Sequence, residues 1–201
     1  MIGIKIIRRL YSLKNPKFFY CDLVVPLSYG LLNQNKLPDA AKETLREAVR
    51  IASQHRAPIA WANSNYLWPR CEEEENQLKV AEANIAGLIT APIIAGGVTN
   101  SITEAQSIRQ TVIKKGLDLQ FRKIAVVVDW PHARSALKIW KHVFPESTII
   151  VISVNGNWHE DHPCFFQCSE ARWLLINIVR HFALILLGMK TVSLFHQPMR
   201  R

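Results

Sequence analysis

Three familiar sequence signatures are missing from this chain of 201 residues. It contains no GxGxxG turn, no Walker loop and no GxSxG nucleophile elbow. Their absence argues against dinucleotide dehydrogenases, P-loop NTPases and ordinary α/β-hydrolases. Cysteine is also scarce, because four residues are too few for a disulfide scaffold. Charges at Lys5, Arg8 and Arg9 interrupt the apolar N-terminal stretch, so we expect no signal peptide and a cytoplasmic protein.

Long apolar runs are equally rare. The longest candidate, Trp173 to Met189, spans 17 residues and includes Asn177, Arg180 and His181. A membrane-spanning helix needs about 20 mostly apolar residues, and a central arginine opposes insertion. We therefore interpret this run as a buried helix with one polar edge. A second interpretation makes the protein membrane-peripheral, with residues 1–19 contacting anionic lipid as a basic, amphipathic stretch.

The composition that remains is that of a globular protein. Hydrophobic residues make up 49% and charged residues 20% of the chain, which suits one domain. We predict a basic extension over residues 1–20, a single domain over residues 21–190 and a tail over residues 191–201. The formal net charge of +9 favours an anionic partner. The basic residues are scattered and not interleaved with aromatic residues, so we do not expect nucleic acid to be that partner.

Apolar runs and helical patterns alternate along the chain. Strands are expected at 22–28, 58–62, 93–94 (closed by Gly96-Gly97), 123–128 and 148–154, and helices at 39–54, 72–86, 101–115, 133–143 and 169–187. The strands are apolar throughout instead of alternating with polar residues, which is typical of parallel sheets covered on both faces. We predict an α/β fold: a three-layer, Rossmann-like open sheet, mostly parallel, with helices on both faces.

In such a sheet, ligands bind beyond the carboxyl ends of the strands. Polar residues gather at four of the predicted strand ends. The candidate ligand-binding residues are Ser28, Gly30, Asn63, Ser64, Asn100, Ser101 and Arg134. Two more side chains, His132 and Glu104, are candidate catalytic residues, because imidazole and carboxylate groups exchange protons near neutral pH.

These strand-end residues also have structural explanations. Ser101 fits a helix N-cap, with Glu104 completing its capping box three residues later. Arg134 fits an ion pair with a neighbouring carboxylate, and the tripeptide at 63–65 fits an ordinary turn.

The order of these motifs resembles a family of bacterial proteins, the domain of unknown function found in YdcF, SanA and ElyC. The resemblance covers about residues 22–188 and is carried by CDLVVPLSYG, REAVRIA, APIAWANSN, CEEEENQ, NSITEA, WPHARSALKIW and SEARWLL. It implies a Rossmann-like fold and a small anionic or nucleotide-like ligand, with poorly defined chemistry. Two alternatives stay open: a hydrolase or transferase acting on a precursor of the bacterial cell envelope, and a non-catalytic protein that docks on a membrane or partner.

The stretch WHEDHPCFFQC at 158–168 concentrates ligand-type side chains. His159, His162, Cys164 and Cys168 would suffice for tetrahedral zinc, although their spacing is not a standard one. We prefer a surface loop without metal, in which the cysteines and phenylalanines form a small apolar patch and the histidines are solvated.

Overall fold

The five strands of the computed structural model run parallel to one another. The structure describes residues 7–8, 11–32, 36–64, 72–117, 120–156, 158, 160 and 162–188. Its strands are β1 (Leu23–Pro26), β2 (Ala60–Ser64), β3 (Ile93–Val98), β4 (Lys123–Asp129) and β5 (Thr148–Val154). Strand β4 pairs with β1 and β5, β2 pairs with β3, and a parallel bridge between Val24 and Ile59 joins the two groups. The order across the sheet is therefore β3-β2-β1-β4-β5.

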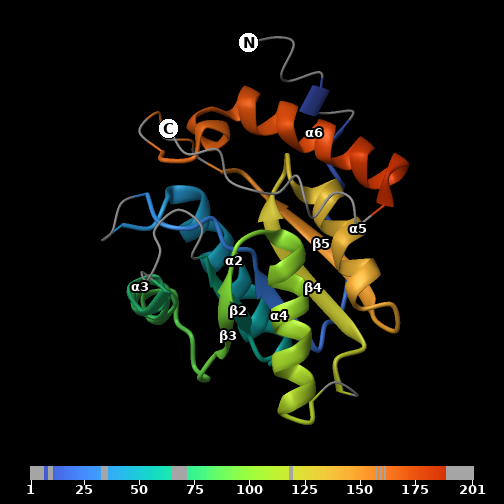
Figure 1. Ribbon diagram of the computed structural model, residues 1–201. Helices are drawn as coiled ribbons and strands as arrows, with labels where there is room; N and C mark the ends of the chain where they lie inside the picture. Colours follow the sequence, from blue (N-terminus) through green and yellow to red (C-terminus); the bar gives the residue numbers. More distant parts are fainter. Residues whose placement is uncertain are drawn as a thin grey trace.

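Helices cover both faces of this sheet. They are α2 (Asp39–His55), α3 (Glu72–Ile85), α4 (Ser101–Lys114), α5 (Ala133–Val143) and α6 (Glu170–Leu186), with a short 3-10 helix, η2 (Phe165–Cys168), before α6. Val25 and Val126 pack with α4 and α5, whereas their strand neighbours Val24 and Ala125 pack with α2 and α3. Figure 1 shows α4 in front of the sheet and α2 behind it. The predicted three-layer α/β fold is confirmed.

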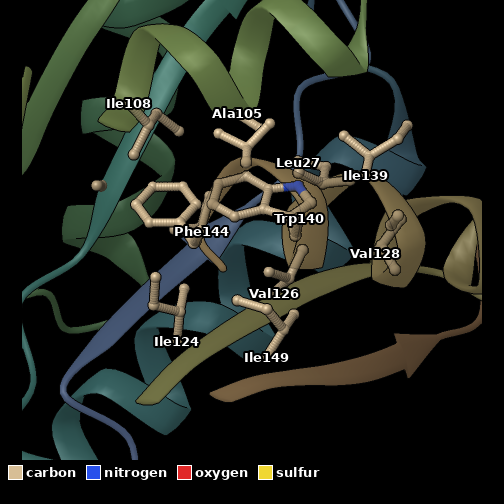
Figure 2. Close-up of a cluster of buried hydrophobic side chains, with 14 of the residues drawn as sticks. Leu27, Ala105, Ile108, Ile124, Val126, Val128, Ile139, Trp140, Phe144 and Ile149 are labelled. Atoms are coloured by element: carbon tan, nitrogen blue, oxygen red, sulfur yellow. The ribbon is translucent and has the colours of Figure 1, made fainter. Parts of the chain in front are cut away.

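The larger core lies between the sheet, α4 and α5. Trp140 of α5 is fully buried, and its ring stacks on Phe144 at a centroid distance of 5.4 Å. Figure 2 shows this pair among strand residues such as Val126 and residues of α4 such as Ile108. Burial on both faces explains why the strands are continuous apolar runs, since neither side of the central strands meets water.

The chain order places a topological switch point at the carboxyl edge of the sheet. The connection after β1 leads to β2 on one side, whereas β4 lies on the other side of β1, so the winding reverses between β1 and β4. At such a switch point the loops that leave neighbouring strands diverge and leave room for a ligand. Helix α6 crosses this carboxyl edge (Figure 1), where its Trp173 hydrogen-bonds Asp129 at the end of β4.

Two predicted elements differ from the structure. Strand β3 runs to Val98 and includes Gly96 and Gly97, because Gly97 and Val98 pair with Asn63 and Ser64 of β2. Helix α6 is not buried on most of its surface: its exposed apolar side chains are Leu175, Val179, Phe182, Ile185 and Leu186. Among the residues that the structure describes, no helix is long and apolar enough to span a bilayer.

The segment before β1 packs on the body of the protein. The Tyr11 hydroxyl donates to the Asn177 carbonyl at 3.1 Å, and the Asn15 side chain hydrogen-bonds both backbone groups of Ser153. Leu13 packs against the larger core. The predicted membrane contact through residues 1–19 gains no support from these contacts, and residues 1–6 and 9–10 lie outside the described part.

Candidate functional site

A buried carboxyl group links β1 to α4. Glu104 is 2% exposed, and its Oε1 accepts a hydrogen bond of 2.8 Å from the Ser28 backbone N–H. Burial raises the pKa of Glu104 to about 7, although the Lys79 ammonium and the Ser28 hydrogen bonds oppose this shift. Around neutral pH this carboxyl group therefore exists in both protonation states.

Lys79 stands between Ser28 and the end of β2. Its Nζ donates to the Ser28 hydroxyl and to the Ala62 carbonyl, both at 2.7 Å, and lies 3.4 Å from Asn63 Oδ1. Nζ also lies 2.6 Å from Glu75 Oε1, in an ion pair within α3.

Glu75 completes this first cluster, because its other carboxylate oxygen accepts the Ser64 backbone N–H at 2.7 Å. The Ser64 hydroxyl oxygen is buried and has no hydrogen-bond partner among the described residues. The first cluster thus joins the ends of β1 and β2 to α3 and α4.

Asp129 is the centre of a second cluster, at the end of β4. Its Oδ1 accepts from the Trp173 indole N–H at 2.8 Å and from the His132 backbone N–H at 3.2 Å, and its Oδ2 accepts from the Tyr29 hydroxyl. Complete burial raises the pKa of Asp129 to about 6, and the hydrogen bonds from Tyr29 and Trp173 limit the shift. The Tyr29 hydroxyl in turn accepts the Asp129 backbone N–H at 2.8 Å.

His132 extends the second cluster toward α4. Its Nδ1 meets the side-chain oxygen of Asn177 on α6, and its Nε2 lies 3.1 Å from the Ser101 hydroxyl oxygen. The ring stacks on Trp173 at a centroid distance of 5.7 Å. His132 is 3% exposed and Asn177 is fully buried, whereas Ser101 is half-buried. Helix α4, the N-cap of α5 and helix α6 therefore contribute one side chain each to a continuous polar chain.

The cap of α4 differs from the predicted one. The N-cap is Asn100, whose Oδ1 accepts the backbone N–H groups of Ile102 and Thr103, both at 2.9 Å. The Thr103 hydroxyl oxygen accepts the Asn100 backbone N–H at 3.0 Å, which completes the capping box. Ser101 and Glu104 are consequently not used for capping, and their side chains bond His132 and Ser28 instead.

The remaining predicted site residues have structural contacts. Gly30 is buried and has a φ of 72°, a left-handed backbone conformation that favours glycine as the chain turns away from β1. Arg134 donates from Nε to the Tyr11 carbonyl, and its guanidinium lies 5.3 Å from the centroid of the Tyr11 ring. Its charge is thus held at the N-terminal segment, and its role in ligand binding stays a prediction. Asn65 lies outside the described residues.

Several site residues were not predicted from the sequence. They are Tyr29, Glu75, Lys79, Asp129, Trp173 and Asn177. Glu75 and Lys79 did carry a signal, because their spacing of four residues aligns them on one face of a helix. Asn177 carried one too, as a lone amide inside an apolar helical run. Neither signal identifies the partner, which is distant in sequence.

The loop before α6 is more buried than predicted. His162 is 2% exposed, contrary to the expectation that the histidines are solvated, and its Nδ1 accepts the Cys164 backbone N–H at 3.0 Å. Cys164 and Cys168 are buried, and Phe165 packs edge-on against Phe166. Within the described residues no group of three or more His, Cys, Asp or Glu side chains is arranged to hold a metal. His159 lies outside those residues.

Comparisons with known proteins identify fold neighbours. No family model matches the chain, and no curated protein does. A solved structure of a universal stress protein in complex with cAMP is 14% identical, with a TM-score of 0.42, covering 68% of this chain and 98% of that one. A universal stress protein from Archaeoglobus fulgidus is 13% identical, with a TM-score of 0.40, covering 68% and 95% respectively.

These neighbours correct the functional prediction. The expected YdcF-like function, with its envelope-precursor and membrane-docking alternatives, is wrong as stated, because the solved structures similar to this chain are universal stress proteins. Membership of the YdcF, SanA and ElyC family itself stays a prediction.

Proposed function

We propose that this protein binds a small, nucleotide-like anionic ligand beyond the carboxyl ends of β1 and β4. The topology supports this class of ligand, since doubly wound parallel sheets bind nucleotides beyond the carboxyl ends of their strands at the switch point. The two polar clusters lie at that place, one beside the end of β1 and the other at the end of β4. The formal net charge of +9 favours an anion.

The observation that carries the proposal is the burial of two carboxyl groups with raised pKa values at one edge of the sheet. Glu104 and Asp129 are both more than nine-tenths buried. Burying ionisable groups destabilises a fold unless they are well paired, and such groups with perturbed pKa values concentrate at functional sites. Half-buried hydroxyls at Ser28 and Ser101 form the accessible side of the same clusters.

The protonation of Glu104 gives the proposal a measurable signature. Below pH 7 this carboxyl group becomes neutral, which removes a buried negative charge next to the ligand. An anionic ligand should therefore bind more tightly at pH 6 than at pH 8. Glu104→Gln mimics the neutral carboxyl group and retains an acceptor for the Ser28 N–H, so its affinity should change less between the two pH values than that of the native protein. Asp129, whose pKa is raised to about 6, keeps part of the pH dependence.

The test is isothermal titration calorimetry at pH 6 and pH 8 with AMP, ATP, cyclic AMP and inorganic phosphate. At least one nucleotide should bind the native protein, with the expected pH dependence reduced in Glu104→Gln. Glu74→Gln, at an exposed position of α3, is the matched control and should behave like the native protein. If no nucleotide binds, or if Glu104→Gln and Glu74→Gln show the same pH dependence, the proposal fails.

A further inference from the structure

Ser101, His132 and Asn177 form a hydrogen-bonded chain in the order hydroxyl, imidazole, amide. Ser101 is the first residue of α4, His132 precedes α5 and Asn177 lies in the middle of α6. The Ser101 Oγ lies 3.1 Å from His132 Nε2, and His132 Nδ1 bonds the Asn177 side-chain oxygen. This is the arrangement of a nucleophile, a base and a group that orients the base.

The amide of Asn177 fixes the tautomer of the imidazole. Its Nδ2 donates to the Trp173 carbonyl at 2.8 Å, so its Oδ1 is the atom that faces His132. A carbonyl oxygen only accepts hydrogen bonds, and His132 Nδ1 must therefore carry the proton. In the neutral ring, Nε2 then carries the lone pair that accepts the hydrogen bond from the Ser101 hydroxyl.

The surroundings hold the base rigidly in this orientation. The His132 ring stacks on Trp173, and the His132 backbone N–H donates to Asp129. Asp129 also accepts the Trp173 indole N–H, so the same carboxyl group hydrogen-bonds both His132 and the residue on which its ring stacks. The Asn177 carbonyl accepts the Tyr11 hydroxyl. A base whose orientation is fixed before the substrate arrives loses little entropy at the reacting step.

Burial separates the base from solvent and leaves the nucleophile reachable. His132 is 3% exposed, whereas Ser101 is half-buried at the start of a 14-residue helix. The helix dipole places positive potential at this end, which stabilises negative charge on the hydroxyl oxygen and on a carbonyl oxygen under attack. The amides of Ile102 and Thr103 already donate to Asn100, so they are not free as oxyanion donors.

From this geometry we infer that Ser101 is a nucleophile that cleaves small carboxylic esters, with His132 as general base and Asn177 as a positioning residue. Ser101 Oγ attacks the ester carbonyl carbon while its proton moves to His132 Nε2. The carbon–oxygen bond to the leaving group then breaks, and His132 returns the proton to the departing alkoxide. Water attacks the acyl-serine and gives a proton to His132, which reprotonates Ser101 as the acid leaves. The net reaction consumes one ester and one water and releases one acid and one alcohol.

The inference does not depend on nucleotide binding, and its test uses no nucleotide. The native protein is incubated with a fluorophosphonate probe, the adduct is located by peptide mass spectrometry, and hydrolysis of p-nitrophenyl acetate is followed in parallel. We expect one phosphonate per chain, on Ser101, and its complete loss in Ser101→Ala. Ser107→Ala, a half-buried serine on the same helix, is the matched control and should label and turn over like the native protein.

Two further variants separate a catalytic chain from a merely structural hydrogen bond. His132→Gln should slow labelling by about 100-fold or more, because the hydroxyl loses its base. Asn177→Asp should still be labelled, but the pH midpoint of its labelling rate should move upward. A carboxylate stabilises the protonated imidazole of His132, whereas the neutral amide of Asn177 does not. A structural role alone would leave that midpoint unchanged.

The outcomes that overturn the inference are equally definite. One is the absence of both labelling and ester turnover in the native protein, and another is labelling that persists in Ser101→Ala. A third is an Asn177→Asp pH profile identical to that of the native protein. Circular dichroism of each variant shows whether it is folded. If His132→Gln does not fold, Ser101→Ala and Asn177→Asp still decide the question.

Discussion

The backbone N–H of Ser28 donates a hydrogen bond to Oε1 of Glu104, 76 residues later in the chain, at 2.8 Å. This hydrogen bond links the first turn of α4 to the loop after β1, next to the switch point between β1 and β4. The acceptor is a buried carboxyl group whose pKa is raised to about 7 by burial. Folding therefore favours the protonated form of Glu104, which makes the stability of the protein depend on pH.

The first prediction concerns the pH dependence of unfolding. The folded pKa of Glu104 exceeds its ordinary value of 4.5, so its neutral form favours the folded state below pH 4.5. That stability is lost between pH 4.5 and 7, because over this range the unfolded chain releases the Glu104 proton while the folded state retains it. Glu104→Gln should raise the free energy of unfolding by about 1 to 3 kcal/mol at pH 8 and leave it nearly unchanged at pH 4.5.

Urea denaturation at the two pH values measures this difference. Asp129, whose pKa is also raised by burial, keeps part of the pH dependence in the variant, at lower pH. Glu74→Gln, at an exposed position of α3, is the control and should change neither value. A loss of stability in Glu104→Gln that is equal at both pH values would mean that Glu104 is ionised throughout.

The second prediction concerns the buried ion pair of α3. The side chains of Lys79 and Glu75 are 6% and 0% exposed, with Nζ and Oε1 2.6 Å apart. Lys79→Met fills similar space but leaves the Glu75 carboxylate buried without its partner, so we expect a loss of roughly 3 to 5 kcal/mol in the free energy of unfolding. Arg50→Met removes a surface ion pair with Glu47, whose side chains are 60% and 27% exposed, and should cost about 1 kcal/mol or less.

Chemical denaturation of both variants at pH 7.5 tests this contrast. Equal losses for Lys79→Met and Arg50→Met would show that the Lys79 site is hydrated and that its hydrogen bonds to Ser28 and Ala62 contribute little.

The layers of the fold could be predicted from the sequence, because buried positions are occupied by apolar residue types. The run KIAVVV at 123–128 is apolar on both strand faces, and β4 is indeed covered on both. Helix α5 begins at Ala133 and ends at Val143, as its periodicity predicted. Helix α6 was misjudged as buried, because a helix that is apolar on most sides gives no sign of which face the protein covers.

The site was only partly predictable, since most of its contacts join residues far apart in sequence. Strand ends located Ser28, Ser101 and His132 correctly at the carboxyl edge. No local pattern indicates that Asn177 would meet His132, 45 residues earlier. The position of Arg134 after a strand does not show that its guanidinium contacts Tyr11. A residue type predicts the chemistry that it offers, but only the tertiary packing selects its partner.

The third prediction tests which residue caps α4. Asn100→Ala removes the acceptor for the Ile102 and Thr103 amides, and with it the reciprocal capping box. We expect it to lower the free energy of unfolding by about 1 kcal/mol, within the range of 0.5 to 2 kcal/mol measured for other N-caps. Gln106→Ala, at an exposed position of the same helix, should stay within about 0.5 kcal/mol of the native protein. Thermal and urea unfolding measure both variants at pH 7. An unchanged midpoint in Asn100→Ala would contradict the assignment and return the capping role to Ser101.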